Sequence, residues 1–183
     1  MNNSNAEIYN CLSNLFEQAI WELHQLVGMQ LLEKIENSHE SLKKEGLGDC
    51  IVSILTASTE SVKVSATIIL PYVLIKRLQG DPSAGEHELL DYCGEINNQL
   101  VGRFKNKLLS YNVRLMLGIP TTLSGSNISG HTIPDSMSSI CHYQHGNDNF
   151  STIFQVVVAS DFEMQDQPDK IDDQPADGEL AFF

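Results

Sequence analysis

The sequence predicts an α+β fold in which a mainly antiparallel sheet packs against long helices. Apolar residues recur every three or four positions over residues 8–27 and again over residues 82–110, which is typical of amphipathic helices. Two β-rich runs between these helices are separated by a short polar turn, as in a hairpin. Further strand-like runs follow the second helix, and this order of elements favours an antiparallel sheet.

The composition suits one soluble domain with its own core, because the chain has 183 residues and is 42% hydrophobic. The longest apolar stretch, residues 66–75, contains Pro71 and is shorter than the roughly 20 residues that span a bilayer. Residues 1–10 show neither the basic nor the apolar segment of a secretory signal. We therefore expect a cytoplasmic protein with no membrane insertion and with reduced thiols at its four scattered cysteines.

The charge is unevenly distributed and excludes one large class of partners. A net charge of −13 opposes nucleic-acid binding, which needs a cationic surface. Residues 161–179 alone hold eight acidic side chains and one lysine. The sequence thus divides into a domain over residues 1–160 and an acidic C-terminal tail over residues 161–183, whose composition is typical of disorder. The tail ends in an apolar tip, residues 180–183, which is either a frayed terminus or a docking peptide.

The first half of the domain is expected to contain a helix, a hairpin and a second, short helix. Gly28 can end the first helix, and residues 29–35 stay open between continued helix and strand. Residues 37–48 are polar and indicate a connector. The hairpin strands cover residues 51–55 and 62–70, Pro71 begins the short helix, and Gly80 closes it.

The second half is expected to contain a long helix followed by strands. Asp81 and Pro82 signal the start of this helix, which continues to about residue 110. Strands are predicted over residues 113–117, 140–144 and 150–159. The segment 118–138 is rich in Gly, Ser, Thr and Pro and is expected to be an exposed loop.

The long helix has one apolar and one polar face. Its predicted buried stripe is Leu89, Cys93, Ile96, Leu100, Phe104 and Leu108. On the opposite face lie Asp91, Glu95, Asn98 and Gly102. Glu95 and Asn98 are surface neighbours because they are three residues apart, so a carboxylate and a carboxamide stand side by side. Taken alone, this pair fits an ordinary solvated helix face.

Two glycines flank the pair and need an explanation. Gly94 and Gly102 each cost about 1 kcal/mol relative to alanine inside a helix. The missing side chains either let another molecule approach the helix backbone or allow close packing within the protein.

Residues 94–102, which read GEINNQLVG, resemble the signature helix of the CheC/CheX/FliY chemotaxis phosphatases. The motif of that family is an Asp or Ser, three residues, Glu, two residues, Asn, and later a proline. Asp91, Glu95 and Asn98 match this spacing, and Pro120 stands 22 positions after Asn98. The hairpin followed by a short helix, residues 52–80, resembles the family as well. A single Glu/Asn pair is more similar to CheX, because CheC and FliY usually carry two.

The resemblance implies a CheX/CheC-like fold, a homodimer and a reaction. The substrate would be a response-regulator receiver domain that carries an aspartyl phosphate, a reactive acyl phosphate. The receiver would hold the divalent metal ion, so the chain would need no metal or cofactor of its own. Asn98 would position the attacking water, since a carboxamide donates and accepts hydrogen bonds without titrating. Glu95 would pair with the active-site lysine of the receiver, and Asp91, Gly94 and Gly102 would contact the substrate.

Two other functions remain open. The chain could be a catalytically inactive CheX-like adaptor that binds a receiver or another signalling protein, which binding without phosphate release would reveal. An unrelated α+β interaction module would be favoured if Glu95 and Asn98 proved buried or lay on different faces.

Two further features of the sequence are possible sites. In a strand, Cys141 and His142 point to opposite faces, and Cys141 and His145 lie roughly 13 Å apart, too far to share a metal ion. Solvent-facing histidines near a turn are the better explanation of this segment. Trp21 lies at the edge of the first apolar stripe, where it is either partly buried or part of a dimer contact.

Overall fold

The computed structural model describes residues 5–27, 32–35, 49–126, 136–160 and 162–165. Gly28, the connector 37–48 and the tail 166–183 lie outside the described residues. The elements, in chain order, are α1 (Asn5–Leu26), β1 (Leu32–Ile35), β2 (Cys50–Ser58), β3 (Val62–Pro71), α3 (Tyr72–Gln79), α4 (Glu86–Leu109), β4 (Met116–Leu117), β5 (Thr121–Gly125), β6 (Met137–His145) and β7 (Asp148–Val158).

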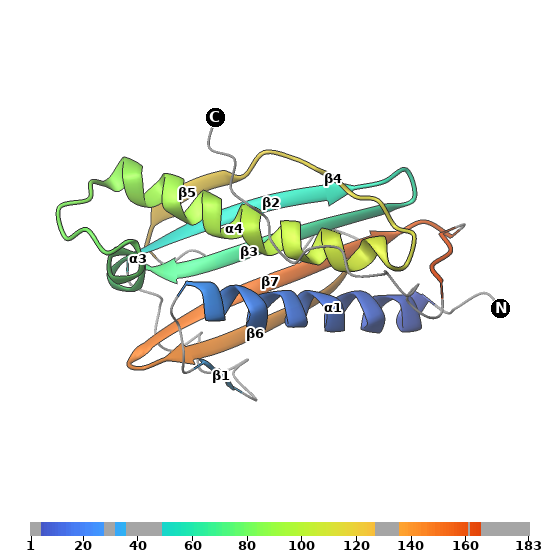
Figure 1. Cartoon of the computed structure of the whole chain (residues 1–183), viewed down its shortest axis with the longest axis horizontal. Coiled ribbons are helices and arrows are strands. Elements are labelled where there is room, and N and C mark those ends of the chain that lie inside the picture. The colour runs from blue at the N-terminus through green and yellow to red at the C-terminus, as the bar shows by residue number, and fades with distance from the viewer. Residues whose placement is uncertain (1–4, 28–31, 36–48, 127–135, 161, 166–183) are drawn as a thin grey trace.

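The strands form one antiparallel sheet in the order β1-β6-β7-β3-β2-β4, with β5 also paired to β2. The β2–β3 and β6–β7 hairpins are its centre, and Gly146 turns the second hairpin with a φ of 61°. Helices α1 and α4 lie side by side across one face of the sheet (Figure 1). The fold is therefore α+β with a mainly antiparallel sheet, as predicted.

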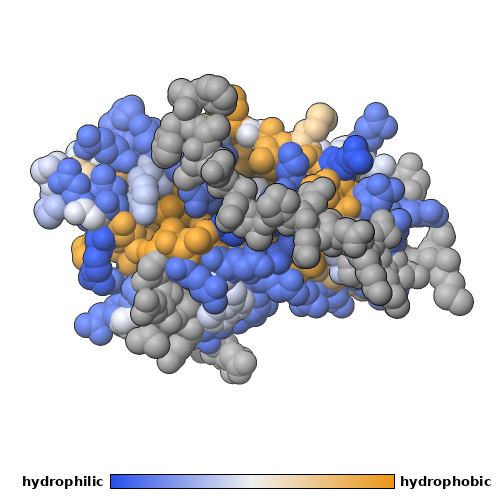
Figure 2. All heavy atoms as spheres, in the orientation of Figure 1, coloured by the Kyte–Doolittle hydropathy of each residue, from blue (hydrophilic) through white to orange (hydrophobic). Residues whose placement is uncertain are grey.

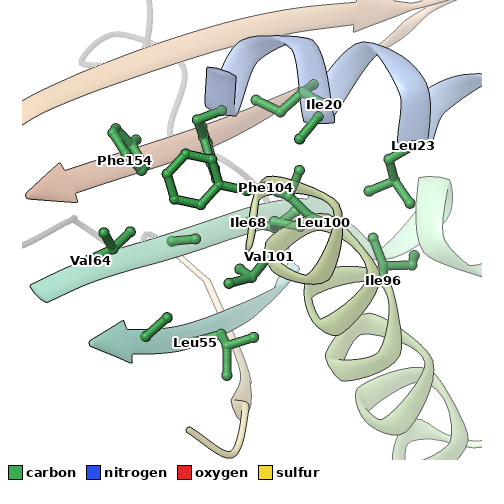
Figure 3. Close-up of a cluster of buried hydrophobic side chains, with 14 of the residues drawn as sticks. Ile20, Leu23, Leu55, Val64, Ile68, Ile96, Leu100, Val101, Phe104 and Phe154 are labelled. Carbon is green, nitrogen blue, oxygen red and sulfur yellow. The ribbon is translucent and has the colours of Figure 1, made fainter. Parts of the chain in front are cut away.

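Alternate residues of the strands face the helices and form the main core, as the pleat of a strand requires. Figure 3 shows Leu55, Val64 and Ile68 of the sheet in one cluster with Leu100 and Phe104 of α4. An aromatic cluster joins three elements, because the ring of Phe16 lies 4.4 Å from that of Phe154 and 5.7 Å from that of Phe104. The predicted buried stripe of α4 is confirmed, since its six residues are at most 6% exposed.

Helix α4 begins later than the sequence predicts. The side chain of Asp81 accepts hydrogen bonds from the backbone N–H and the hydroxyl of Ser83, which closes a separate turn before the helix. Gly85 then caps α4, and the carboxylate of Glu88 accepts the Gly85 N–H at 2.8 Å. The start signal at residues 81–82 therefore belongs to this separate turn, and α4 begins at Glu86.

Three strand predictions also need correction. The expected loop 118–138 contains β5, which pairs with β2 as an edge strand. Only Met116–Leu117 of the predicted strand 113–117 pairs with β2. The ambiguity over residues 29–35 is resolved for Leu32–Ile35, which form β1 against β6. Such edge pairings depend on distant partners, and their sequences lack the apolar alternation of a half-buried strand.

The histidines of β6 do not all face solvent. His142 is only 7% exposed, and its Nδ1 lies 2.8 Å from the hydroxyl oxygen of Ser151 on β7. The expectation of a solvent-facing residue is therefore wrong for His142. Trp21 is 38% exposed, and its ring stands perpendicular to that of Tyr143, with 6.4 Å between the ring centroids. Among the described helices, none combines the length and apolarity that a membrane span needs.

His24 on α1 couples the stability of the fold to pH. The imidazole is 5% exposed, stacks on Phe150, and donates its Nδ1–H to the Ile20 carbonyl at 2.6 Å. Burial lowers the pKa of His24 to about 4, His145 lowers it further, and the Ile20 carbonyl opposes the shift.

Acidification is therefore expected to destabilise the protein through His24. Because its pKa is lower in the folded state than in the unfolded state, this stability is complete above about pH 6.5 and is lost as the pH falls toward 4. The loss amounts to about 3 kcal/mol. Urea unfolding of the wild type and of His24→Phe between pH 7 and pH 4 measures this loss. As the pH falls, the free energy of unfolding of the wild type should decrease by this amount relative to that of the variant. Parallel curves would contradict the assignment.

Candidate functional site

The outward face of α4 carries the four residues that the wheel grouped together. Asp91 and Glu95 are exposed and Asn98 is partly exposed, while a Cβ added at Gly102 would meet nothing within 4 Å. This places the acid and the amide on one open surface, one helical turn apart. Figure 2 shows that the N-terminal half of α4 is largely hydrophilic on its visible side. The alternative of an unrelated module, which required Glu95 or Asn98 to be buried or separated, loses its main support.

The carboxylate of Glu95 is available to an incoming cation. Its Oε1 accepts a hydrogen bond from the amide of Gln99 at 3.3 Å, and the ion pairs of the described residues do not include it. Asp91 lies one turn earlier, with its Oδ2 3.1 Å from Nδ1 of His87. The two carboxylates make this end of the face negative, which suits a positively charged group of a partner.

The C-terminal half of α4 carries positive charge, which a carboxylate on α1 partly neutralises. Lys107 lies 2.5 Å and Arg103 3.9 Å from the carboxylate of Glu22 on α1. These pairs tie α4 to α1 on the side away from β5. The outward face therefore has a negative N-terminal half next to a compensated C-terminal half.

Gly94 does not offer its backbone to another molecule, contrary to the prediction. It is buried, and a Cβ built on it would lie 3.3 Å from Cγ2 of Thr122 and 3.7 Å from Cγ of Pro120. The close approach is made by the chain itself, where β5 and the preceding segment pack on α4. Gly102 is the glycine of the pair that stays open to a partner.

The segment before β5 forms a wall beside the site that the sequence analysis did not identify. The backbone N–H of Gly118 donates to the Thr56 carbonyl at 2.8 Å, and a Cβ at Gly118 would be 3.0 Å from that oxygen. Pro120 packs against Gly94 on the other side of Ile119. The backbone of Ile119 is therefore held at Gly118 and at Pro120, although its side chain is 89% exposed. The proline of the motif was the available signal, because a shared motif residue is expected to pack near the site.

Two adjacent asparagines of α4 have opposite roles. Asn98 faces outward, whereas Asn97 is fully buried and donates hydrogen bonds from Nδ2 to the carbonyls of Ser53 and Ala66 and to the Ser53 hydroxyl. The helix wheel predicted that Asn97 points inward, but its partners on β2 and β3 were not predicted.

The chemistry that the side chains of this face can supply is orientation and charge. Within the described part of the chain, no three His, Cys, Asp or Glu side chains gather as a metal ion would need. An exposed amide can hold a water molecule, and an exposed carboxylate can bind an ammonium group. Both groups are presented on a rigid helix, which suits the docking of a partner that brings the reacting bond.

Comparisons with known proteins identify the family and the fold of this chain. Residues 50–143 match the family described as chemotaxis phosphatase CheX. Among solved structures, CheX from Vibrio vulnificus has a TM-score of 0.68 at 16% identity, covering 80% of this chain and 99% of its own. A CheC-like superfamily protein from Shewanella sp. PV-4 has a TM-score of 0.64 at 17% identity, covering 80% of this chain and 97% of its own.

A third similar structure is the CheX–CheY–BeF3–Mg2+ complex from Borrelia burgdorferi, with a TM-score of 0.56 at 13% identity, covering 78% of this chain and 96% of that chain. No curated protein matches the sequence. At these identities the solved structures establish the fold, and the family match covers more than half of the 183 residues, including the whole of α4. The chain therefore belongs to the CheX family of chemotaxis phosphatases.

Proposed function

We propose that this CheX-family chain dephosphorylates the aspartyl phosphate of a CheY-like response-regulator receiver in bacterial chemotaxis or two-component signalling. The observation that carries the proposal is the exposure of Glu95 and Asn98 together on one face of α4. A similar solved structure, the Borrelia CheX–CheY complex, supports a receiver as the partner. We also propose a cytoplasmic location and a homodimer, as the resemblance implies, and light scattering of the purified protein would test the dimer.

The proposed reaction is an in-line hydrolysis in which the receiver supplies the reactive bond and the divalent metal ion. The water oxygen forms a bond to phosphorus while the bond from phosphorus to the aspartyl oxygen breaks, which leaves an aspartate carboxylate and inorganic phosphate. Asn98 accepts a hydrogen bond from the water and aims its lone pair at phosphorus, and the proton of the water passes to the phosphate product. The chain contributes orientation, which can account for a large part of such a barrier.

Glu95 has a docking role in this proposal. The lysine of the receiver active site is a cation beside the phosphoryl group, and the carboxylate of Glu95 is free to pair with it. This contact sets the register of α4 in the receiver cleft, and Asn98 then stands one turn away from it, over the phosphorus. Asp91 adds negative charge at the edge of the same contact.

The experiment is a phosphate-release assay on a panel of receivers that have been phosphorylated by a small phosphodonor. A catalytic amount of the chain should accelerate release from at least one receiver by tenfold or more. Binding of the chain to a beryllofluoride-activated receiver is measured in parallel. Tight binding with unchanged release would contradict the phosphatase and favour the inactive adaptor.

Filling the open space at Gly102 is expected to stabilise the helix and impair the reaction. Gly102→Ala and Gly102→Leu both replace a helix-interior glycine where an added Cβ meets no atom within 4 Å, so each should stabilise the fold by up to about 1 kcal/mol. The leucine side chain should also obstruct the receiver and raise KM about tenfold, while the alanine, a matched control, should change KM less than threefold. A leucine variant with the wild-type KM would show that the receiver does not approach Gly102.

A further inference from the structure

Asn97 of α4 occupies an unusual place for an amide. Its side chain is 0% exposed, and Nδ2 lies 3.0 Å from the Ser53 carbonyl, 3.2 Å from the Ser53 hydroxyl and 3.2 Å from the Ala66 carbonyl. The Oδ1 atom is buried as well and accepts no hydrogen bond. The unpaired buried acceptor lowers stability, and the hydrogen bonds from Nδ2 offset part of that loss.

The contacts of Asn97 restrain α4 in a way that its apolar neighbours do not. Hydrophobic contacts are non-directional, so the apolar side chains that Figure 3 shows on this helix, Ile96, Leu100 and Val101, restrain it only through the fit of their packing. Asn97, in contrast, donates hydrogen bonds to two adjacent strands, β2 and β3. Two polar anchors at fixed distances define the rotation of the helix about its axis and its position along the sheet.

We propose that Asn97 is a positioning residue that fixes the rotation of α4, so that Asn98 and Glu95 meet the receiver in register. This inference rests on the function proposed above. Consecutive helical residues point about 100° apart, so a rotation at Asn97 is transmitted directly to Asn98. A turn of about 20° moves a side-chain tip by about 2 Å at the radius of a helix, and a misplacement of about 1 Å can lower a rate by about 100-fold.

The test is Asn97→Leu, which has nearly the shape of asparagine but lacks its donor and its unpaired acceptor. The variant takes a donor from the Ser53 and Ala66 carbonyls but also removes the unpaired acceptor, so the two effects oppose each other and the thermal midpoint should change little. The kcat of phosphate release should nevertheless fall at least tenfold. A residue with a merely structural role would give the opposite result, a lower midpoint with an unchanged kcat. Asn97→Ala repeats the test if the leucine variant does not fold.

Ser151→Ala is the matched control, because it also removes a buried polar side chain. Ser151 on β7 is 2% exposed, and its hydroxyl oxygen lies 2.8 Å from Nδ1 of His142. Its neighbours Phe150 and Thr152 point toward the helices, so Ser151 points to the sheet face away from α4. This variant should lower the thermal midpoint and keep the wild-type kcat. In an Asn98→Ala background, Asn97→Leu should lower kcat less than twofold further, because its effect acts through Asn98.

The outcomes separate this inference from the proposed function. An active wild type with an Asn97→Leu variant of equal kcat would overturn the positioning role and leave the phosphatase in place. A wild type without activity on any receiver would overturn the phosphatase. The crystal structures of the wild type and Asn97→Leu would then decide the positioning role: a rotated α4 with a displaced Asn98 supports it, and an unchanged helix overturns it.

Discussion

Replacing Asn98 by alanine is expected to lower the kcat of phosphate release by about 100-fold, with no loss of stability. The side chain is partly exposed on α4, and alanine is the best helix former, so the fold should tolerate the change. The rate falls because the water is no longer held in line with phosphorus, which is the contribution that orientation makes to such a reaction. Single-turnover release from a saturating phosphorylated receiver measures the effect without interference from binding.

Two companion variants sharpen this result. Asn98→Asp keeps the shape of the side chain but replaces its donor by a negative charge next to the phosphoryl group, so it should be at least as slow as the alanine variant. Asn106→Ala removes an exposed asparagine from the same helix outside the proposed site and should keep the wild-type rate. Equal rates for Asn98→Ala and Asn106→Ala would remove Asn98 from the mechanism.

Replacing Glu95 by alanine is expected to weaken docking more than it slows the bound reaction. A hydrogen bond between charged groups contributes about 1.5–3 kcal/mol, which corresponds to a rise in KM of roughly 10- to 150-fold. Because the Glu95 carboxylate makes no ion pair among the described residues, its loss should not destabilise the fold. Titration of a beryllofluoride-activated receiver with the wild type and Glu95→Ala measures the affinity directly.

The dependence of receiver affinity on salt concentration tests the Glu95 contact independently. The affinity of the wild type should fall as ionic strength rises, and the slope should be smaller for Glu95→Gln, which keeps the shape without the charge. Glu60→Gln, an exposed carboxylate in the turn between β2 and β3, is the matched control. If both variants show the same salt slope and affinity, Glu95 has no particular place in the docking.

The part of the site that lies on α4 could be predicted from the sequence, because it follows from one periodicity. Once the apolar stripe is placed at Leu89, Cys93 and Ile96, the count of 3.6 residues per turn fixes the direction of Glu95 and Asn98. The inward direction of Asn97 follows in the same way. The helical period alone therefore predicts which side chains of α4 face outward, and no knowledge of the other elements is needed.

The remaining features depend on residues far apart in the chain, and local patterns do not contain them. From the sequence, Gly94 could serve either the approach of another molecule or close packing within the protein. The packing of Pro120 and Thr122 on α4 shows that it serves close packing. Strand β5 is polar and pairs only at an edge, so its partner on β2 determines it rather than its own pattern. The same holds for Asn97, whose hydrogen-bond partners lie 31 and 44 residues away.

The most direct test of the account is a crystal structure of this chain bound to a beryllofluoride-activated receiver. We expect the outward face of α4 to enter the receiver active site, with the Asn98 amide within hydrogen-bond distance of a water in line with beryllium. Glu95 should then contact the receiver lysine. A receiver bound to any other surface, with Asn98 left in solvent, would contradict the account.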